Sequence, residues 1–337
     1  MTGTRVSAVF KPEQTLGTED SLRDWLRFPS KLTFKYQANN NMREYYSIGS
    51  KFMDNATAGM FTGTWEAGFV LDYRYLNILG LAFEGYSYEN GVHSFYKANG
   101  MRVPSMSVRV KKLNRIVDGS KDQTTILKGC VLKSISINQS SGNAPLECRI
   151  SGQYVDETSD YSNLSETDYP EYYDDSEDCL PIEWACMVIG DKAVANTESV
   201  SFSVENNLQL MSGCGSRFYT NYDEGQTTIS LSTSCYSKDP ETYYQKMYSG
   251  GFDSTLNAPR VKNLKPIPEM SIRSSYDEDD DGQADYSLSL VCSKVWVNSA
   301  GQFNFDANSK ILDNPQFKVK NFKLNIKSDT GRITVWE

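Results

Sequence analysis

The residues that come closest to a metal site lie in the acidic segment DEDDDGQAD, which starts at Asp277. Four carboxylates fit ligand positions within the first nine residues of a calcium-binding loop, namely Asp277, Asp279, Asp281 and Asp285. The twelfth position is Leu288 instead of a bidentate Glu, and no helix-forming segment flanks the loop. We therefore expect the tip of a β-hairpin with a turn at Gly282 and no metal, with a calcium loop as the weaker alternative.

Other catalytic chemistry finds little support in residue type and spacing. His93, the single histidine, precedes Ser94 in a segment that we interpret as a loop, and no oxyanion motif accompanies the pair. The segment GCGSRF at Gly213 lacks the third glycine and the strand–helix setting of a dinucleotide site. Carboxylates are numerous enough to include a glycosidase pair, but their number alone does not indicate one. We expect no enzyme and no cofactor.

The seven cysteines show no CxxC spacing. The nearest pair, Cys179 and Cys186, is too widely spaced for a zinc knuckle. Free cysteines in apolar or alternating segments behave as small core residues. Four cysteines lie in such segments, namely Cys130, Cys148, Cys235 and Cys292. The sequence predicts reduced, structural cysteines.

The composition indicates that strands must carry any functional surface. The chain has 337 residues, 12% of them aromatic, and its 21 Tyr favour half-buried, pleated surfaces. This length suffices for two domains, each with its own core. No run of about 18 apolar residues and no apolar leader is present, so we expect folding in a cytoplasm and no membrane contact. The net charge of −9 disfavours binding to nucleic acid through its phosphates.

An internal repeat is the most informative pattern. The segments that begin at Lys31 and at Glu198 align without gaps at an offset of 166 in residue number, which places Phe34 on Val200. The alignment places Asn40-Asn41 on Asn206-Asn207 and Gly49-Ser50 on Gly215-Ser216. Further matches follow in the same order, with Met106 on Met270, Cys130 on Cys292, and the segment from Asn143 on that from Asn314, at offsets of 164, 162 and 171. Small drifts in offset are typical of loop insertions, so we predict two copies of one domain.

Alternation of apolar and polar residues predicts strands throughout both copies, as in Val200, Phe202 and Val204. Each copy also has one predicted short helix. The first spans Asp72 to Gly85, and the second starts at Asp239-Pro240 and ends at Gly250-Gly251. A further helix is predicted from Thr18 to Phe28. The expected domain is a β-sandwich or open barrel with one flanking helix.

These patterns divide the chain into four parts. Residues 1–30 form an N-terminal arm, 31–155 the first copy, 156–195 an acidic linker and 196–337 the second copy. The linker includes ten acidic residues and no basic one between Asp156 and Asp178. Such a stretch cannot enter a core, so a solvated linker is favoured over a docking segment that uses its tyrosines.

The run from Glu198, ESVSFSVENNLQLMSGCGSRFYTNYDEGQTTISLSTSCY, and the helix predicted after it resemble the core of the tail tube proteins of long-tailed phages. An alternating strand leads into an Asn-Asn-aliphatic turn, a Gly/Ser-basic connection, a turn glycine and a second alternating strand. The first copy keeps this order, with Met42 after its asparagines. The resemblance covers roughly residues 30–155 and 196–327.

The resemblance implies a structural virion protein that assembles into stacked rings. In that family, strands of neighbouring domains join into a barrel around a lumen, and members with two fused domains form trimeric, pseudo-sixfold rings. The implied location is the virion tail, assembled in the host cytoplasm. The implied partners are further copies of the chain, viral DNA passing without specific binding, and tape-measure, terminator and baseplate proteins. We expect the strand faces that line the lumen to carry a net negative charge, because basic residues would bind phosphates.

A carbohydrate-binding or adhesive β-sandwich module of a virion or cell surface is the alternative. The tyrosine content and the aspartate-rich loop favour this class, whereas the expected absence of a secretion leader disfavours a module secreted by a host cell.

Overall fold

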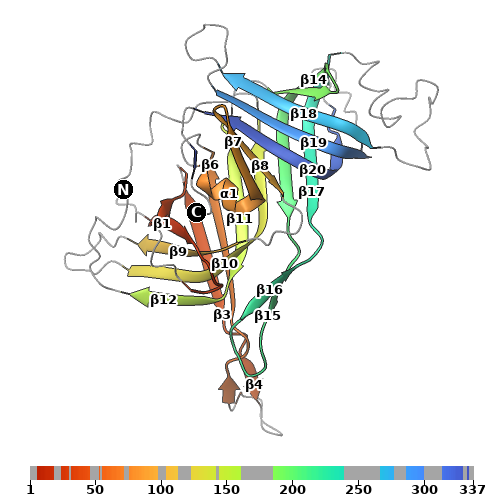
Figure 1. Cartoon of the computed structure of the whole chain (residues 1–337). Helices are drawn as coiled ribbons and strands as arrows, with labels where there is room; N and C mark the ends of the chain where they lie inside the picture. The colour runs from red at the N-terminus through yellow and green to blue at the C-terminus, as the bar shows by residue number, and fades with distance from the viewer. Residues whose placement is uncertain are drawn as a thin grey trace, which may run out of the picture.

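The computed structural model shows a mostly β protein with one short helix among its described residues. The structure describes residues 6–18, 24–29, 32–45, 53, 55–71, 76–97, 104–112, 123–141, 144–160, 185–238, 266–276, 286–299, 313–328 and 332–333. Two β-structures, one from each half of the chain, lie side by side and are joined by the pairing of one strand from each (Figure 1).

The second half forms a closed antiparallel barrel of six strands. The order around the barrel is β14–β13–β18–β19–β20–β17, and β17 pairs again with β14. The strands are β13 (Ala185–Ile189), β14 (Lys192–Glu205), β17 (Thr228–Ser237), β18 (Ile267–Tyr276), β19 (Tyr286–Ser299) and β20 (Gln316–Lys327). Closure pairs the strand edges that would otherwise be open, and one side chain in two points into the barrel.

The first half follows a similar path from strand to strand, in the order β1–β9–β10–β11–β6–β3. Its strands are β1 (Val6–Pro12), β2 (Leu26–Arg27), β3 (Thr33–Asn39), β6 (Thr62–Val70), β9 (Ser105–Lys112), β10 (Gln123–Gln139), β11 (Glu147–Tyr154) and β12 (Asp156–Asp160). β2 pairs with β1 and is followed by Phe28, whose ring centroid lies 4.9 Å from that of Phe10 in β1 and 6.0 Å from that of Phe34 in β3. Phe28 thus connects the two ends of this path.

β10 belongs to two layers because it bends. Its first part pairs with β9 and β12, and its last part pairs with β11 and β14. At the bend, Gly129 has a φ of +63°, and a Cβ there would lie 1.8 Å from a methyl group of Val155. The buried carboxylate of Glu13 accepts hydrogen bonds from the Gly129 amide (2.9 Å) and the Ser107 hydroxyl (2.7 Å). Glycine and a satisfied buried carboxylate therefore fix the place where the strand changes layers.

One antiparallel sheet runs across both halves. Its strand order is β3–β6–β11–β10–β14–β17–β20–β19, with four strands from each half. The two halves meet where Ser134–Gln139 of β10 pair with Val200–Glu205 of β14. In Figure 1 the strands β6, β11, β14 and β17 of this sheet run roughly vertically through the centre of the molecule.

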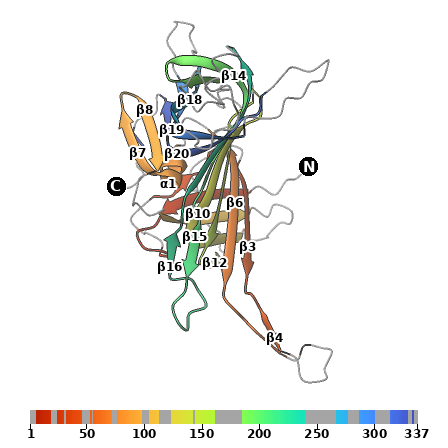
Figure 2. The ribbon, with the colours of Figure 1, turned by 90° about the vertical axis from the view of Figure 1, so that its right-hand side faces the viewer.

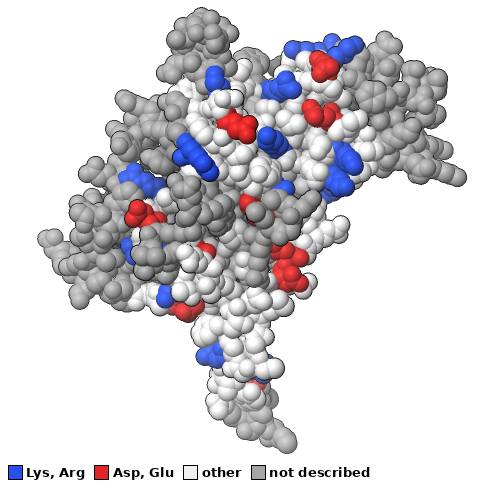
Figure 3. Space-filling view, viewed as in Figure 1, with Lys and Arg blue, Asp and Glu red and all other residues white. Residues whose placement is uncertain are grey.

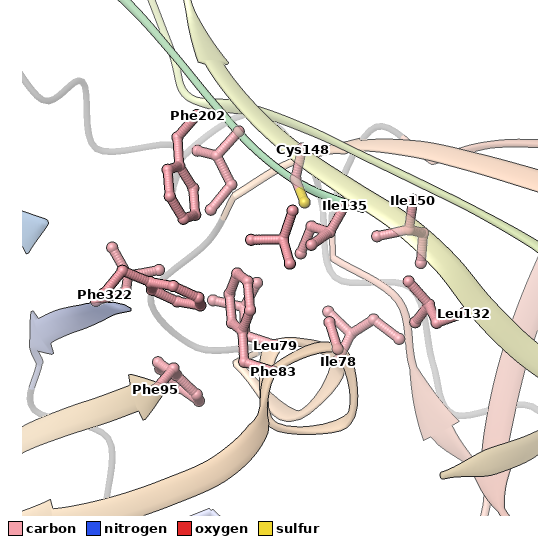
Figure 4. Close-up of a cluster of buried hydrophobic side chains, with 14 of the residues drawn as sticks. Ile78, Leu79, Phe83, Phe95, Leu132, Ile135, Cys148, Ile150, Phe202 and Phe322 are labelled. Carbon is pink, nitrogen blue, oxygen red and sulfur yellow. The ribbon is translucent and has the colours of Figure 1, made fainter. Parts of the chain in front are cut away.

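The helix α1 (Asn77–Phe83) lies in a core to which both halves contribute (Figure 4). The ring of Phe83 lies 5.0 Å from that of Phe322 and 6.4 Å from that of Phe202, both in the second half. Six of the seven helix residues are buried, because the helix is covered on nearly all sides. The hairpin β7 (Glu84–Glu89) and β8 (Val92–Lys97) follows, and β8 adds to β20 of the second half.

Two narrow arms extend from the sheet in the same direction (Figures 1 and 2). One contains β4 (Arg43–Tyr45) and β5 (Asn55–Thr57), between β3 and β6. The other contains β15 (Leu208–Met211) and β16 (Asn221–Glu224), between β14 and β17. The arms touch where the Arg217 Nε donates to the carbonyl oxygen of Gly59 (3.2 Å) and the Phe61 amide donates to that of Arg217 (2.9 Å).

Strand pairing in the two halves follows one register. All seven pairs between β3 and β6, from Thr33↔Gly68 to Asn39↔Thr62, recur between β14 and β17 at an offset of 166. The three pairs between β4 and β5 recur between β15 and β16 at the same offset.

The later strands correspond at an offset of 165. The pair Lys128↔Asp156 recurs as Ser293↔Asn321. The left-handed backbone of Gly129 recurs at Lys294, with a φ of +52°. The bulge between Leu132 and Ser134, beside β11, recurs between Val297 and Ser299, beside β20.

The offsets of 164, 162 and 171 expected for the later matches are therefore wrong. In the first half Leu127 pairs with Val108, and in the second half Cys292 pairs with Met270. Cys292 therefore corresponds to Leu127, at an offset of 165, and Met270 corresponds to Val108, at an offset of 162. The match of Met106 with Met270 is shifted by two positions, and the match of the segment from Asn143 is shifted by six. Both shifts are even, so they leave the alternation of inward and outward residues unchanged. The match of Cys130 fails because this residue directly follows the bend, where the alternation is interrupted.

The helix expected from Thr18 to Phe28 is wrong over its described part, since Asp24 to Phe28 are not helical and Leu26–Arg27 form β2. Pairing with β1 outweighs the helical spacing of the apolar residues, since local propensity is a weak guide against tertiary contacts. The helix in the first copy is confirmed over Asn77–Phe83. The helix expected from Asp239 lies outside the described residues.

Parts of the segments expected to be an arm and a linker are strands of the sheet. Val6–Pro12 form β1 within residues 1–30. Asp156–Asp160 form β12, Ala185–Ile189 form β13, and β14 begins at Lys192, all within residues 156–195. The acidic stretch 161–184 lies outside the described residues.

Candidate assembly surface

The sheet that crosses both halves has one buried face and one polar face. Alternation places Trp65, Ile150, Ile135, Phe202 and Leu231 on the buried face. The polar face of the central strands consists largely of hydroxyl and amide side chains, namely Ser134, Ser136, Asn138, Ser151, Ser201, Ser203, Thr228, Ser230 and Ser232. A polar exposed face and an apolar covered face are typical of an antiparallel sheet that contacts water on one side.

Many of these polar groups bind one another across the strands. The Ser134 and Ser151 hydroxyls lie 2.7 Å apart, and the Ser201 hydroxyl donates to Asn138 Oδ1 at 2.6 Å, across the junction of the halves. Cross-strand hydrogen bonds of this kind hold neighbouring strands in register. The result is a mostly uncharged polar band in the centre of the sheet, with the Glu205 carboxylate opposite Ser134 as a charged member.

Charged side chains on this face have both signs. Lys35 lies opposite Glu66, Arg149 lies 3.8 Å from Glu147, and Lys318 donates to the Ser230 hydroxyl at 2.8 Å. The outer surface in Figure 3 also shows basic and acidic residues interspersed over its described part. With Glu205 included, acidic and basic side chains both occur on this face, and the net negative charge that we expected on the strand faces is not found on its described residues.

The junction of the halves is covered on its apolar side. Ile135 and Ile137 of β10 lie beside Val204 and Phe202 of β14 in the pairing, and all four side chains are buried. Asn206 ends this contact, since its amide donates to the Lys133 carbonyl oxygen at 2.7 Å. Burial of four apolar side chains contributes several kcal/mol, at about 1.5 kcal/mol or more each, to holding the halves together.

A buried ionic cluster links the hairpin to the second half. The Lys97 ammonium binds the Glu84 carboxylate, donates to Asn206 Oδ1 at 3.1 Å and lies 3.5 Å from Glu224. Burial raises the pKa of Glu84 to about 7, against the opposing influence of Lys97. The second carboxylate oxygen of Glu84 is buried without a hydrogen-bond partner in the described structure, which explains why burial outweighs the cation.

The arms carry the large apolar side chains that are most exposed among the described residues. Their exposed fractions lie between 42% and 55% for Met42, Tyr45, Met53, Met211 and Phe218. The Phe218 ring also lies 5.6 Å from that of Phe61, at the place where the arms touch. Exposed apolar groups gathered on one part of a surface are typical of contact sites.

The acidic segment considered for calcium lies outside the described residues. β18 and β19, which flank it in sequence, are antiparallel and pair up to Tyr276↔Tyr286. This pairing agrees with the expectation of a hairpin, and the absence of calcium at Asp277, Asp279, Asp281 and Asp285 stays a prediction. Within the described ranges, no group of three or more His, Cys, Asp or Glu side chains could hold a metal ion.

His93 is not a loop residue, as the sequence suggested, because it lies in β8 and is fully buried. Its Nδ1 lies 3.0 Å from the Tyr86 hydroxyl. The hairpin that contains it was missed, although Asn90-Gly91 between alternating residues is a strong turn signal. Lys97 and Glu84 lie at the ends of this hairpin, and their role was also not predicted.

The four cysteines expected in the core are buried and free, namely Cys130, Cys148, Cys235 and Cys292. Burial raises the pKa of Cys292 to about 12 and raises the pKa of Cys130 and Cys148 as well. These thiols are therefore uncharged core groups without nucleophilic character. No helix in the described part of the chain is long and apolar enough to cross a membrane.

Comparison with known sequences gives one family. A family model described as phage tail tube protein matches residues 83–282, more than half of the chain. This range includes the hairpin, the junction between β10 and β14, and most of the second barrel. A search of curated proteins found no match.

Proposed function

The chain belongs to the phage tail tube protein family, and we propose that it assembles into stacked rings that form the tube of a virion tail. In this role it is a structural protein and not an enzyme. The tube would conduct viral DNA into the host cell. Assembly would take place in the host cytoplasm, with tape-measure, terminator and baseplate proteins as further partners.

The observation that carries this proposal is the antiparallel sheet that crosses both halves, with four strands from each. A sheet with one apolar covered face and one polar face can curve into the wall of a channel. Head-to-tail contacts between such sheets close into a ring if the rotation between copies permits it.

We also propose that the halves are copies of one domain, with 31–155 and 196–337 as the repeated units and β1 and β13 as matching strands before them. The shared register of β3–β6 and β14–β17 supports this division. A further agreement comes from the Asn side chains beside the turn glycines. Asn41 Nδ2 donates to the Met60 carbonyl oxygen at 2.7 Å, and Asn207 Nδ2 donates to that of Gln226 at 2.6 Å.

Changes of side-chain size between the halves compensate one another, as expected after duplication of a packed core. Gly63 lies opposite Tyr154 in the first half, where the second half has Ile229 opposite Val319. Trp65 opposite Gly152 is likewise replaced by Leu231 opposite Phe317. In each pair one residue is larger and the other smaller than its counterpart, so the two changes partly offset each other, and cores tolerate such exchanges.

Two domains per chain favour a trimeric ring with pseudo-sixfold symmetry. Four strands from each of six domains would form a barrel of about 24 strands, wide enough for an open lumen. The mostly uncharged band of Ser, Thr and Asn side chains on the polar face suits a lumen through which DNA passes, since phosphate binding needs clustered basic residues.

Negative-stain electron microscopy of the purified chain tests the proposal. We expect stacked rings or tubes with a central channel at high protein concentration. A carbohydrate-binding or adhesive module would instead give dispersed single particles, and particles without rings at all concentrations and salt conditions tested would contradict the proposed function.

A further inference from the structure

Each of the two arms has at its base an asparagine that binds a cation from another part of the chain. Asn40 precedes the first arm (β4 and β5), and its counterpart at the offset of 166, Asn206, precedes the second arm (β15 and β16). Asn206 Oδ1 accepts a hydrogen bond from the Lys97 ammonium at 3.1 Å. Asn40 Oδ1 accepts one from the Arg217 guanidinium at 3.4 Å. The same position of the fold thus binds a cation in both halves.

Lys97 connects both strands of the second arm to the hairpin of β7 and β8. Besides Asn206, which precedes β15, its ammonium contacts Glu224, the last residue of β16, at 3.5 Å. The side chains of Lys97 and Glu224 are only 17% and 18% exposed, so water and salt screen this contact in part. Hydrogen bonds to a charged group are stronger than those between neutral groups. The base of the second arm is therefore linked to the hairpin at two points.

The first arm cannot bind a cation at two points in this way. Ala58 takes the place of Glu224 at the offset of 166, and its methyl group does not bind cations. Asn40 keeps its role, but the cation that it binds is Arg217, which belongs to the connection between β15 and β16. The first arm is therefore linked to the second arm at the position where the second arm is linked to the hairpin.

Burial at the base of the first arm agrees with this link. The Arg217 Nε donates to the Gly59 carbonyl oxygen at 3.2 Å, and the Phe61 amide donates to that of Arg217 at 2.9 Å. The Phe61 side chain is 6% exposed, and its ring lies 5.6 Å from that of Phe218. Gly59 is buried, whereas its counterpart Gly225 in the second arm is exposed. The second arm thus covers the base of the first arm.

We propose that Lys97 and Arg217 position the two arms in series. Lys97 holds the second arm on the hairpin, and Arg217 of the second arm holds the first arm. The order has a direction, because loss of Arg217 releases the first arm alone, whereas loss of Lys97 releases both arms. The series explains why both arms extend in the same direction (Figures 1 and 2), and it fixes how their exposed apolar side chains are presented together. This inference concerns a single chain and goes beyond the proposed assembly.

Hydrogen exchange at two matched backbone amides reports on the two arm bases. The Gly59 amide donates to the Asn40 carbonyl oxygen at 2.9 Å, and the Gly225 amide donates to that of Asn207 at 2.8 Å. Local opening of either arm base breaks one of these hydrogen bonds and speeds exchange at that amide. The exchange rates are measured on the full-length chain at a concentration below that of assembly, so the result does not depend on ring formation.

Two variants test the order of the series. We expect Arg217→Ala to raise the exchange rate of the Gly59 amide at least tenfold and to change that of the Gly225 amide less than twofold. We expect Lys97→Met to raise both rates at least tenfold. Lys97→Arg keeps a cation at this position and should return both rates to within threefold of those of the parent.

The controls separate positioning of the arms from loss of overall stability. Lys133→Met and Arg43→Ala each remove an exposed cation near an arm base, and both exchange rates should stay within twofold of the parent. The Val204 amide, in the pairing of β14 with β10 and β17, is the internal reference, because global unfolding would speed its exchange as well.

Three results would overturn the proposal. Unchanged exchange at Gly59 in Arg217→Ala would show that this side chain does not hold the first arm. Faster exchange at Gly225 alone in Lys97→Met would show that the arms are held independently. Equal acceleration at Val204, Gly225 and Gly59 in Lys97→Met would show that Lys97 stabilises the whole fold without positioning the arms.

Discussion

The carboxylate of Glu84 pairs with the ammonium of Lys97 at the two ends of one hairpin, which also contacts the second half through the pairing of β8 with β20. Lys97 extends the contact to Asn206 and Glu224. Buried charges need partners, since an unpaired one costs several kcal/mol. The stability of this contact therefore depends on the ionisation of Glu84.

The pH dependence of stability should report on Glu84. Its folded pKa of about 7 lies above the ordinary value of 4.5, so the folded chain holds this proton more tightly than the unfolded chain does. The stabilisation is therefore complete below pH 4.5 and is lost as the pH rises toward about 7. Urea unfolding of the parent and of Glu84→Gln at pH 5 to 8 measures this pH dependence. We expect the unfolding free energy of the variant to change less with pH.

Glu205→Gln is the matched control, because Glu205 is an exposed carboxylate near the same junction. Its profile should follow that of the parent. If Glu84→Gln retained the full slope between pH 5 and 7, the assignment of this titration to Glu84 would be wrong.

Removal of the Lys97 cation should lower the unfolding free energy more than removal of the Glu84 carboxylate does. Lys97→Met leaves Glu84 buried without its counter-ion, which typically costs about 3 kcal/mol of unfolding free energy. The loss should be larger at pH 8 than at pH 5.5, where Glu84 can bind a proton. Equal losses at both pH values in thermal or urea unfolding would contradict this account of the cluster.

The exchange of side-chain sizes between the halves can be tested by transplantation. A Cβ at Gly63 would lie 2.5 Å from the Tyr154 ring, so Gly63→Ile alone should cost about 3 kcal/mol of unfolding free energy. Adding Tyr154→Val recreates the Ile229–Val319 pair, and more than half of the loss should return. Part will remain lost, because the Tyr154 hydroxyl donates to Glu157 at 2.8 Å.

Gly213→Ile is the control, because a Cβ there meets no atom within 4 Å. Its combination with Tyr154→Val should show no recovery. Additive losses in the Gly63→Ile and Tyr154→Val double variant, measured by urea unfolding, would remove this support for common descent of the halves.

Maleimide labelling of the folded chain should distinguish the cysteines. Cys214 is exposed and should react within minutes, whereas Cys130, Cys148 and Cys292 are buried thiols of raised pKa. Peptide mapping after brief labelling gives the result for each site, and Cys214→Ser should remove the modification expected there. Rapid modification of Cys292 in the folded state would contradict the placement of β19 in the second barrel.

Much of the sheet could be predicted from the sequence because alternation survives in both halves. The offset of 166 predicted from Asn40-Asn41 and Asn206-Asn207 is the offset that the strand pairing shows. Register is specified wherever one face is buried, so a residue pattern is enough to find it. The pattern misled where a bend interrupts it, as the match of Cys130 beside Gly129 shows.

The strand β2 and the ionic cluster around Lys97, which were not predicted, depend on contacts between residues distant in sequence. Leu22, Trp25 and Leu26 have helical spacing, but Leu26 pairs with Phe10 in β1, which local sequence does not indicate. The ionic cluster joins Lys97 to Asn206, in the other half of the chain. Nothing in the local sequence marks Lys97 as different from other lysines near strand ends.

The most direct test of the central claim is a cryo-electron microscopy reconstruction of the assembled chain. The account predicts three chains per ring, six similar domains around a channel and a wall of about 24 strands. Six chains per ring, or a channel without a continuous wall of strands, would contradict it.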